Sequence, residues 1–182
     1  QHPEGRFLPE TYHYTRGMSD LDLLRRAALA MDKAVADAWD ARAAGIPIQT
    51  PEQLLTLASI IEKETGKASE RPEIAGVFAR RLRLGMRLQT DPTVIYGMGS
   101  QYNGNIRRSD LTTDTPYNTY TRAGLPPTPI AMPGRAALFA AANPADGDAL
   151  YFVARGDGSH VFSATLAEHN RAVACHQLKR CR

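Results

Sequence analysis

The chain has 182 residues, about the size of one domain, and its 43% hydrophobic and 23% charged residues are ordinary for a globular protein and exclude a disordered one. The 22 Lys and Arg against 19 Asp and Glu give a net charge of +3, far from that of a dedicated nucleic-acid-binding domain. No apolar run reaches the roughly 18–20 residues that span a bilayer. The opening Gln1-His2-Pro3-Glu4 also lacks an initiator Met and the apolar core of a signal peptide. We therefore expect a soluble fragment or mature form, without the segment that targets the full-length protein.

Hydrophobic periodicity and capping residues predict six helices. Residues 1–18 are expected to be irregular or short extended structure. Ser19, followed three residues later by an acid, begins the first helix with a capping box. Thr50 and Pro51 begin a second, strongly apolar helix, for which Gly66 offers a left-handed stop. The expected helices cover 20–44, 51–65, 71–84, 91–96, 133–142 and 166–178.

Two further segments complete the expected architecture. From 97 to about 132 the chain is rich in Gly, Pro, Asn, Thr and Tyr, and a long irregular stretch of this kind is often functional. Residues 151–154 and 160–162 flank an Asp157-Gly158 turn, which is a hairpin signal. The sequence thus predicts an α+β fold: a mostly helical single domain with a small antiparallel sheet and a long functional loop.

The two cysteines, Cys175 and Cys181, lie at the C-terminal end, in a tail over 175–182. They are too few for a zinc site and form no Cys-x-x-Cys pair. Two states are open to them, a local disulfide in an oxidising compartment or free thiols on a frayed tail. The sequence also lacks a His-Glu-x-x-His motif, a P-loop and a Gly-x-Ser-x-Gly motif, so we expect no metal and no cofactor.

Two glutamates stand at the end of the second apolar run, on either side of Lys63. At 100° per residue, Glu64 lies roughly 70° from the centre of the apolar face and Glu62 roughly 90° away on the other flank. A carboxyl group against apolar neighbours has a raised pKa and can act as a general acid near neutral pH. The alternative is two solvated glutamates at a helix end. Because the pair diverges around one helix, the two cannot flank one glycosidic bond as ordinary glycosidase carboxylates do.

Short polar side chains follow the third helix. Gln89, Thr90 and Asp91 suit hydrogen bonding to hydroxyl or acetamide groups, while Asp91 also fits the N-cap of the fourth helix. Tyr117-Asn118-Thr119-Tyr120, on a proline-stiffened loop, is either a sugar platform or an ordinary surface loop.

A cluster of arginines precedes these residues and has two interpretations. It is either a solvated helix face or a site for an anionic polymer. Its members are Arg80, Arg81, Arg83 and Arg87.

Several motifs occur in order along the chain. They are LASIIEKET at 57–65, RLGMRLQTDPTVIYG at 83–97, YNTY at 117–120, GLPP at 124–127, NP at 143–144, YFVA at 151–154, HVF at 160–162 and EHN at 168–170. With these motifs the chain resembles the YceG-like (MltG) family of endolytic murein transglycosylases, from about residue 4 to residue 173. Several separated motifs in one order are far more specific than any one of them.

The resemblance implies a bacterial inner-membrane enzyme with one membrane-spanning segment and a catalytic domain facing the periplasm and cell wall. Such enzymes cut nascent glycan strands between N-acetylmuramic acid and N-acetylglucosamine and leave a 1,6-anhydro end. Residues 1–182 would form the catalytic domain, with 1–18 as the remnant of a connection to a LysM-like and transmembrane region. The implied partners are peptidoglycan strands and cell-wall synthases, with no nucleic acid.

The family's single essential glutamate corresponds to Glu64, or alternatively to Glu62, as general acid and base. The helical arithmetic favours Glu64 because it lies nearer the apolar face. The residues expected to bind sugar or to orient the acid are Glu62, Gln89, Asp91, Asn118 and Tyr120. Two other functions stay open, a non-catalytic peptidoglycan-binding module and a plain glycoside hydrolase.

Overall fold

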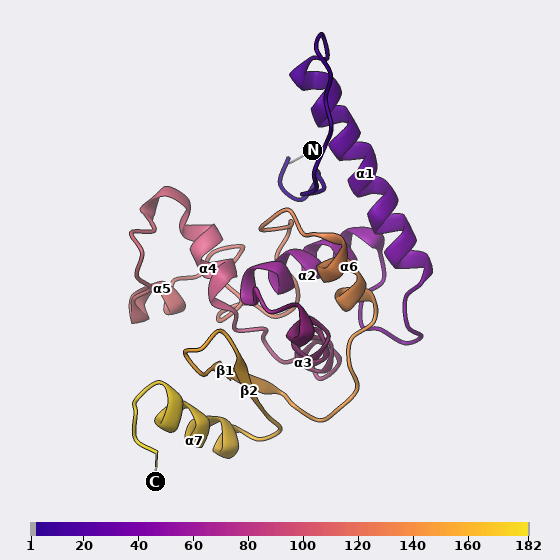
Figure 1. The fold of residues 1–182 in the computed structure, drawn as a ribbon. Coiled ribbons are helices and arrows are strands. Elements are labelled where there is room, and N and C mark those ends of the chain that lie inside the picture. Colours follow the sequence, from indigo (N-terminus) through magenta and orange to yellow (C-terminus); the bar gives the residue numbers. More distant parts are fainter. Residues whose placement is uncertain (1–2, 182) are drawn as a thin grey trace.

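The computed structural model describes residues 3–181, so Gln1, His2 and Arg182 lie outside the described part. Within that part the fold has seven α-helices and one two-stranded antiparallel sheet (Figure 1). The helices are α1 (Asp20–Asp40), α2 (Pro51–Glu64), α3 (Arg71–Arg83), α4 (Asp91–Met98), α5 (Arg108–Thr112), α6 (Arg135–Ala142) and α7 (Leu166–His176). The strands are β1 (Tyr151–Ala154) and β2 (His160–Ser163), and two short 3-10 helices are η1 (Ala68–Glu70) and η2 (Gly99–Gln101). The expected α+β, mostly helical single domain is confirmed.

Helix α2 is the centre of the core. All eight of its residues from Leu54 to Ile61 are buried, because α1, α3, α4 and α6 pack around it. Because these helices surround α2, no side of its run from Leu54 to Ile61 faces solvent, and the run needs no polar stripe. The alanines of α6 leave little side-chain bulk between the two helices, so α6 lies close against α2 (Figure 1). Each fully buried Leu or Ile contributes about 1.5–3 kcal/mol to folding.

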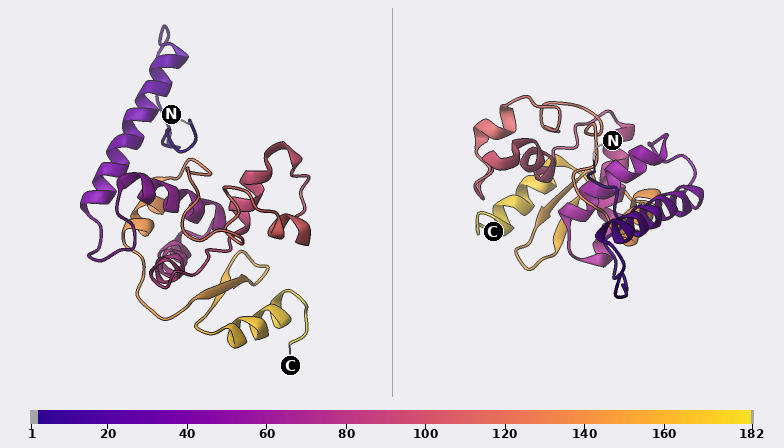
Figure 2. Two further views of the ribbon diagram at one scale, coloured as in Figure 1. Left: turned by 180° about the vertical axis from the view of Figure 1, so that it is seen from behind. Right: turned by 90° about the horizontal axis from the view of Figure 1, so that it is seen from above.

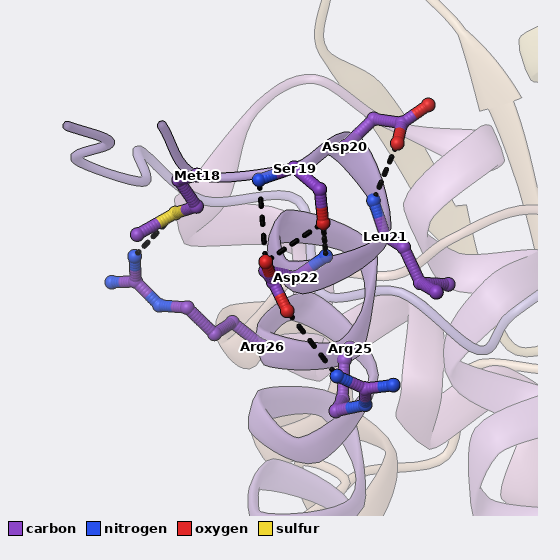
Figure 3. A network of polar contacts seen from close by, with 7 residues as sticks. All are labelled: Met18, Ser19, Asp20, Leu21, Asp22, Arg25 and Arg26. Atoms are coloured by element: carbon purple, nitrogen blue, oxygen red, sulfur yellow. Dashed lines mark hydrogen bonds and ion pairs between the residues drawn. The ribbon is translucent and has the colours of Figure 1, made fainter. Parts of the chain in front are cut away.

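Helix α1 projects from the helices packed around α2, and the N-terminal segment runs beside it (Figures 1 and 2). Its predicted capping box is confirmed: the Asp22 N–H donates to Ser19 Oγ at 3.1 Å, and the Ser19 N–H donates to Asp22 Oδ2 at 3.2 Å (Figure 3). Arg25 and Arg26 extend the network to Asp22 and to Met18. The helix ends at Asp40, earlier than the expected stop at Gly45.

The structure also departs from the predicted boundaries of α2 and α4. Helix α2 ends at Glu64 because Thr65 is extended, with φ −145°; Gly66 is not in the left-handed region. Helix α4 has Thr90 as its N-cap, and Asp91 is its first helical residue. The fourth helix also runs past Tyr96 to Met98.

The hairpin and α7 form a C-terminal unit, which we define as residues 149–177, that is β1, β2, α7 and the residues that adjoin them; residues 3–148 are the helical body. The predicted hairpin is confirmed, with its second strand one residue longer than expected: Tyr151 pairs with Ser163 and Ala154 with His160. Helix α7 packs on both strands. The unit lies below the helical body in Figure 1 and is connected to α3. The Cys175–Cys181 disulfide is formed at the end of α7, which decides between the two states left open by the sequence.

Two of the clustered arginines attach the C-terminal unit to α3. Arg80 Nε donates to Ala149 O at 2.7 Å, and Arg81 Nε donates to Leu150 O at 2.7 Å. Only 7% of Arg81 is exposed. Both interpretations of the cluster, a solvated face and a polymer site, are therefore wrong for this pair: their charged groups bind backbone carbonyls.

Part of the expected long loop is regular, because η2 and α5 lie within it. Asn118 holds the end of α5 and the residue after it, because its Nδ2 donates to the carbonyls of Asp110, Leu111 and Thr113. Among the helices of residues 3–181, none combines the length and apolar character that a membrane crossing requires.

Candidate active site

A pocket of about 440 Å³ lies between the helical body and the C-terminal unit. The body contributes Glu64, Arg81, Leu88, Gln89, Asp91 and Tyr120. The C-terminal unit contributes Tyr151–Ala154, His160, Leu166, His169, Val173 and Gln177. Four of the six residues singled out from the sequence thus share one pocket, although they come from three separate segments.

Glu64 is the last residue of α2, and its partly buried carboxyl faces this pocket. The pKa of Glu64 is raised from 4.5 to about 7: burial is the largest cause and raises it, a hydrogen bond from the Thr90 hydroxyl lowers it, and the charge of Asp91 raises it. Burial dominates because a charged carboxylate loses hydration against apolar neighbours. Near neutral pH a large fraction of Glu64 therefore carries a proton that it can donate.

The backbone of Thr90, whose hydroxyl donates to Glu64 Oε1, is held by buried threonines. Thr90 N–H donates to Thr119 Oγ1 at 3.0 Å, and the hydroxyls of Thr93 and Thr119 are 2.8 Å apart. All three threonines are at most 2% exposed. Because one oxygen of Glu64 accepts from Thr90, the other oxygen is left to carry the proton into the pocket.

Asp91 and Tyr120 form a second polar pair on the same side. Tyr120 Oη donates to Asp91 Oδ1 at 2.5 Å, and burial, followed by this bond, raises the pKa of Tyr120. Gln89 lies beside them with φ +52°, a left-handed conformation that is uncommon for a residue with a side chain. Its N–H donates to Thr119 O at 3.1 Å, which fixes the backbone next to Thr90.

The structure does not bring Glu62 and Asn118 into the pocket. Glu62 Oε2 accepts the N–H of Gly134 at 3.0 Å, at the start of α6, and Oε1 lies 3.5 Å from Arg71. Asn118 is 1% exposed, and its Oδ1 accepts the N–H of Tyr120. Both side chains are occupied with bonds that hold the fold together.

Sequence reasoning missed the opposite wall. Tyr151 stacks on His169, with ring centroids 5.3 Å apart and planes 27° apart, and the Arg81 guanidinium lies 5.0 Å from the Tyr151 ring. His160 contributes a third ring to the same side of the pocket. Aromatic faces of this kind suit the C–H faces of a sugar ring. The hairpin pattern predicted the strands, but their side chains could be assigned to a site only once α7 was placed.

The pocket thus combines a proton-donating carboxyl with polar and aromatic side chains that can hold a carbohydrate. Over residues 3–181, no three His, Cys, Asp or Glu side chains are grouped so as to hold a metal ion.

The comparisons with known proteins agree on one family. Residues 1–175 match the model of the YceG-like family. An endolytic murein transglycosylase of Bacillus subtilis is 38% identical over 173 residues, which cover 94% of this chain and 48% of that protein. One from Streptococcus pneumoniae is 34% identical over 95% of this chain and 32% of that protein. The chain therefore spans about half the length of the first relative and a third of the second.

A solved structure shares the fold. The crystal structure of a yceG-like protein from Listeria monocytogenes has a TM-score of 0.79 and 39% identity to this chain. The match covers 92% of this chain and 54% of that one.

Proposed function

The chain belongs to the YceG-like family, and from that premise we propose that it is the catalytic part of an endolytic murein transglycosylase. Its substrate would be a glycan strand of peptidoglycan, cleaved between N-acetylmuramic acid and N-acetylglucosamine. The relatives carry this activity in their names, and the match extends over nearly the whole of this chain.

The observation that carries the proposal is the Glu64 carboxyl, with its pKa near 7, at the wall of a pocket large enough for sugar. Glu64 donates its proton to the glycosidic oxygen as a general acid. The C6 hydroxyl of the muramic acid then closes on C1, so that no water is consumed and a 1,6-anhydro end forms. Glu64 afterwards regains the proton that this hydroxyl loses, and the substrate's acetamide stabilises the positive charge at C1.

Five further side chains have assigned roles in this proposal. Gln89, Asp91 and Tyr120 bind sugar from the side of Glu64. Glu62 and Asn118 act at a distance, since the former anchors α6 and the latter orders the segment before Tyr120.

The test compares Glu64→Gln with Glu62→Gln on uncrosslinked glycan strands, with folding checked by circular dichroism. We expect Glu64→Gln to abolish anhydro-ended products and Glu62→Gln to retain them. Activity in Glu64→Gln together with its loss in a folded Glu62→Gln would move the acid to Glu62 and leave the family unchanged.

The same assay separates the two other candidate functions. A glycan-binding module would bind strands and yield no product. A plain glycoside hydrolase would yield reducing ends, and mass spectrometry distinguishes these because the anhydro product is lighter by one water.

A location at the outer face of the bacterial inner membrane, with a single-pass anchor, also belongs to this proposal. Murein lies outside that membrane, so the catalytic part must face the periplasm and cell wall. Cell-wall synthases, which produce nascent strands, are the protein partners that this location offers.

A further inference from the structure

His160, which lines the pocket, forms a carboxylate–imidazole pair with Glu70 behind it. His160, the first residue of β2, has Nδ1 2.8 Å from Glu70 Oε2, and its N–H donates to Glu70 Oε1 at 3.2 Å. Both side chains are 11% exposed. Burial raises the pKa of Glu70, but the bonds from His160 and Lys67 outweigh it and leave the pKa below its usual value. Glu70 is therefore ionised at neutral pH, and Nδ1 carries the hydrogen.

The ring of His160 is fixed from the sides as well. Phe152 meets it edge-on, with ring centroids 5.4 Å apart and planes 87° apart, and Phe162 lies 6.4 Å away. Within residues 3–181, no protein group hydrogen-bonds to Nε2, and this atom is not sealed from solvent. His160 lines the same pocket as Glu64. With Nδ1 bonded to Glu70, Nε2 is the atom that can accept a proton in the pocket.

We propose that His160 is a second catalytic residue: its Nε2 takes the proton from the attacking hydroxyl of the substrate and returns it to Glu64. This inference rests on the proposed function and names the path by which Glu64 regains its proton. A carboxylate that accepts Nδ1–H fixes the tautomer and the orientation of an imidazole, as Glu70 is placed to do here.

The other carboxyl groups of the pocket are less suited to this step. Glu64 Oε1 already accepts from Thr90, so a single oxygen would have to give one proton and collect the next. Asp91 Oδ1 accepts from Tyr120. His160 Nε2 has no such competing bond from the described residues.

The protons and electrons balance along this path. Glu64 gives its proton to the glycosidic oxygen, and the bond from C1 to that oxygen breaks with its electron pair on the oxygen. The C6 oxygen forms a bond to C1 and loses its proton to Nε2. The imidazolium, facing ionised Glu70, then passes that proton to the Glu64 carboxylate, directly or through one water. Both residues end as they began.

The experiment compares His160→Asn with His13→Gln in the glycan-cleavage assay. Asn retains a donor near the position of Nδ1, so it can keep the bond to Glu70 while removing Nε2. General acid–base groups contribute about 10²–10⁴-fold to rate, and we expect His160→Asn to lower kcat at least 100-fold with KM changed less than threefold. His13 is exposed and is not one of the pocket-lining residues, so His13→Gln should match the wild type.

Two further variants keep the test decisive. Imidazole added to His160→Ala should restore part of kcat, a recovery that a merely structural role would not give. If His160→Asn fails to fold, His160→Gln replaces it, and Glu70→Gln should lower kcat about 10–100-fold, as loss of an outer partner does.

The outcomes separate the two proposals. A wild-type protein that makes no anhydro ends overturns the proposed function. A wild type that makes them, beside a folded His160→Asn or His160→Gln that keeps more than a third of kcat, overturns the role of His160 alone. Lack of imidazole rescue in a folded His160→Ala also counts against it.

Discussion

The environment of the Glu64 carboxyl opposes its ionisation. In water it would be ionised at pH 7, whereas here burial moves its pKa to about 7. Such an environment destabilises the fold at neutral pH, since the unfolded chain ionises the group freely. In the proposed reaction this cost has a function, because Glu64 holds its proton until a leaving oxygen can take it.

The first prediction concerns the free energy of unfolding that is lost when buried Glu64 ionises. The folded pKa of about 7 exceeds the unfolded value of 4.5, so the penalty is absent below pH 4.5, grows as pH rises and is complete above pH 7. Glu64→Gln should therefore stabilise the protein at pH 8, by at most about 3 kcal/mol, and should have no such effect at pH 4. Urea unfolding at both pH values measures it. An equal change at both values would contradict the shift.

The second prediction concerns Thr90, whose hydroxyl bond lowers the pKa of Glu64. Thr90→Val removes the hydroxyl and keeps the shape, so the pKa of Glu64 should rise above 7. Because a general acid works only while protonated, the fall of kcat/KM at alkaline pH should move to higher pH. Thr90→Ser, which retains a hydroxyl, should keep the wild-type profile. A profile that shifts equally in both variants would rule out this hydrogen bond as the cause.

At the scale of helices and strands, sequence patterns predicted those features that depend on residues close together in the chain. The buried run of α2, the capping box at Ser19 and the strands of the hairpin are all local signals. The ends of α2 and α4 were misplaced because they depend on contacts with other segments. Thr90, for example, meets Glu64 across 26 residues of chain and Thr119 across 29.

The arginines of α3 illustrate the same limit. A charge in a helix usually faces water, and nothing in the local pattern distinguishes Arg81 from Arg83. The difference is that the hairpin later in the chain places Leu150 O within reach of Arg81, whereas Arg83 reaches only Gly45 O at 3.2 Å near the surface. The candidate site was accordingly predictable on the side of Glu64 and not on the side of the hairpin.

The third prediction follows for these two arginines. Arg81→Met leaves the carbonyls of Leu88 and Leu150 without their donor, and unsatisfied buried groups cost about 1–3 kcal/mol each. We expect a loss of about 2–4 kcal/mol in the free energy of unfolding. Arg83→Met should change it by less than about 1 kcal/mol. Chemical denaturation measures both, and equal losses would show that Arg81 is not an internal tether.

At the scale of the whole molecule, the pocket lies between two parts whose residues are buried to different degrees. The helical body is organised around α2, with a continuous core, whereas none of the residues described in α7 is fully buried. The C-terminal unit is joined to the body by the Arg80 and Arg81 bonds from α3, by the Phe78–Phe152 ring contact and by the Glu70–His160 pair. One wall of the pocket is therefore more firmly held than the other.

The fourth prediction concerns how easily the two walls of the pocket open locally. Regions with few buried contacts open locally at lower free energy than the core, so amide hydrogens of β1, β2 and α7 should exchange faster than those of α2. Because both walls line one pocket, a bound glycan oligosaccharide would contact both, and binding to the closed form should slow exchange in the C-terminal unit. Hydrogen exchange of Glu64→Gln, with and without oligosaccharide, measures this without turnover. Protection confined to the helical body would mean that Tyr151, His160 and His169 do not meet the substrate, and the aromatic wall would then lose its role.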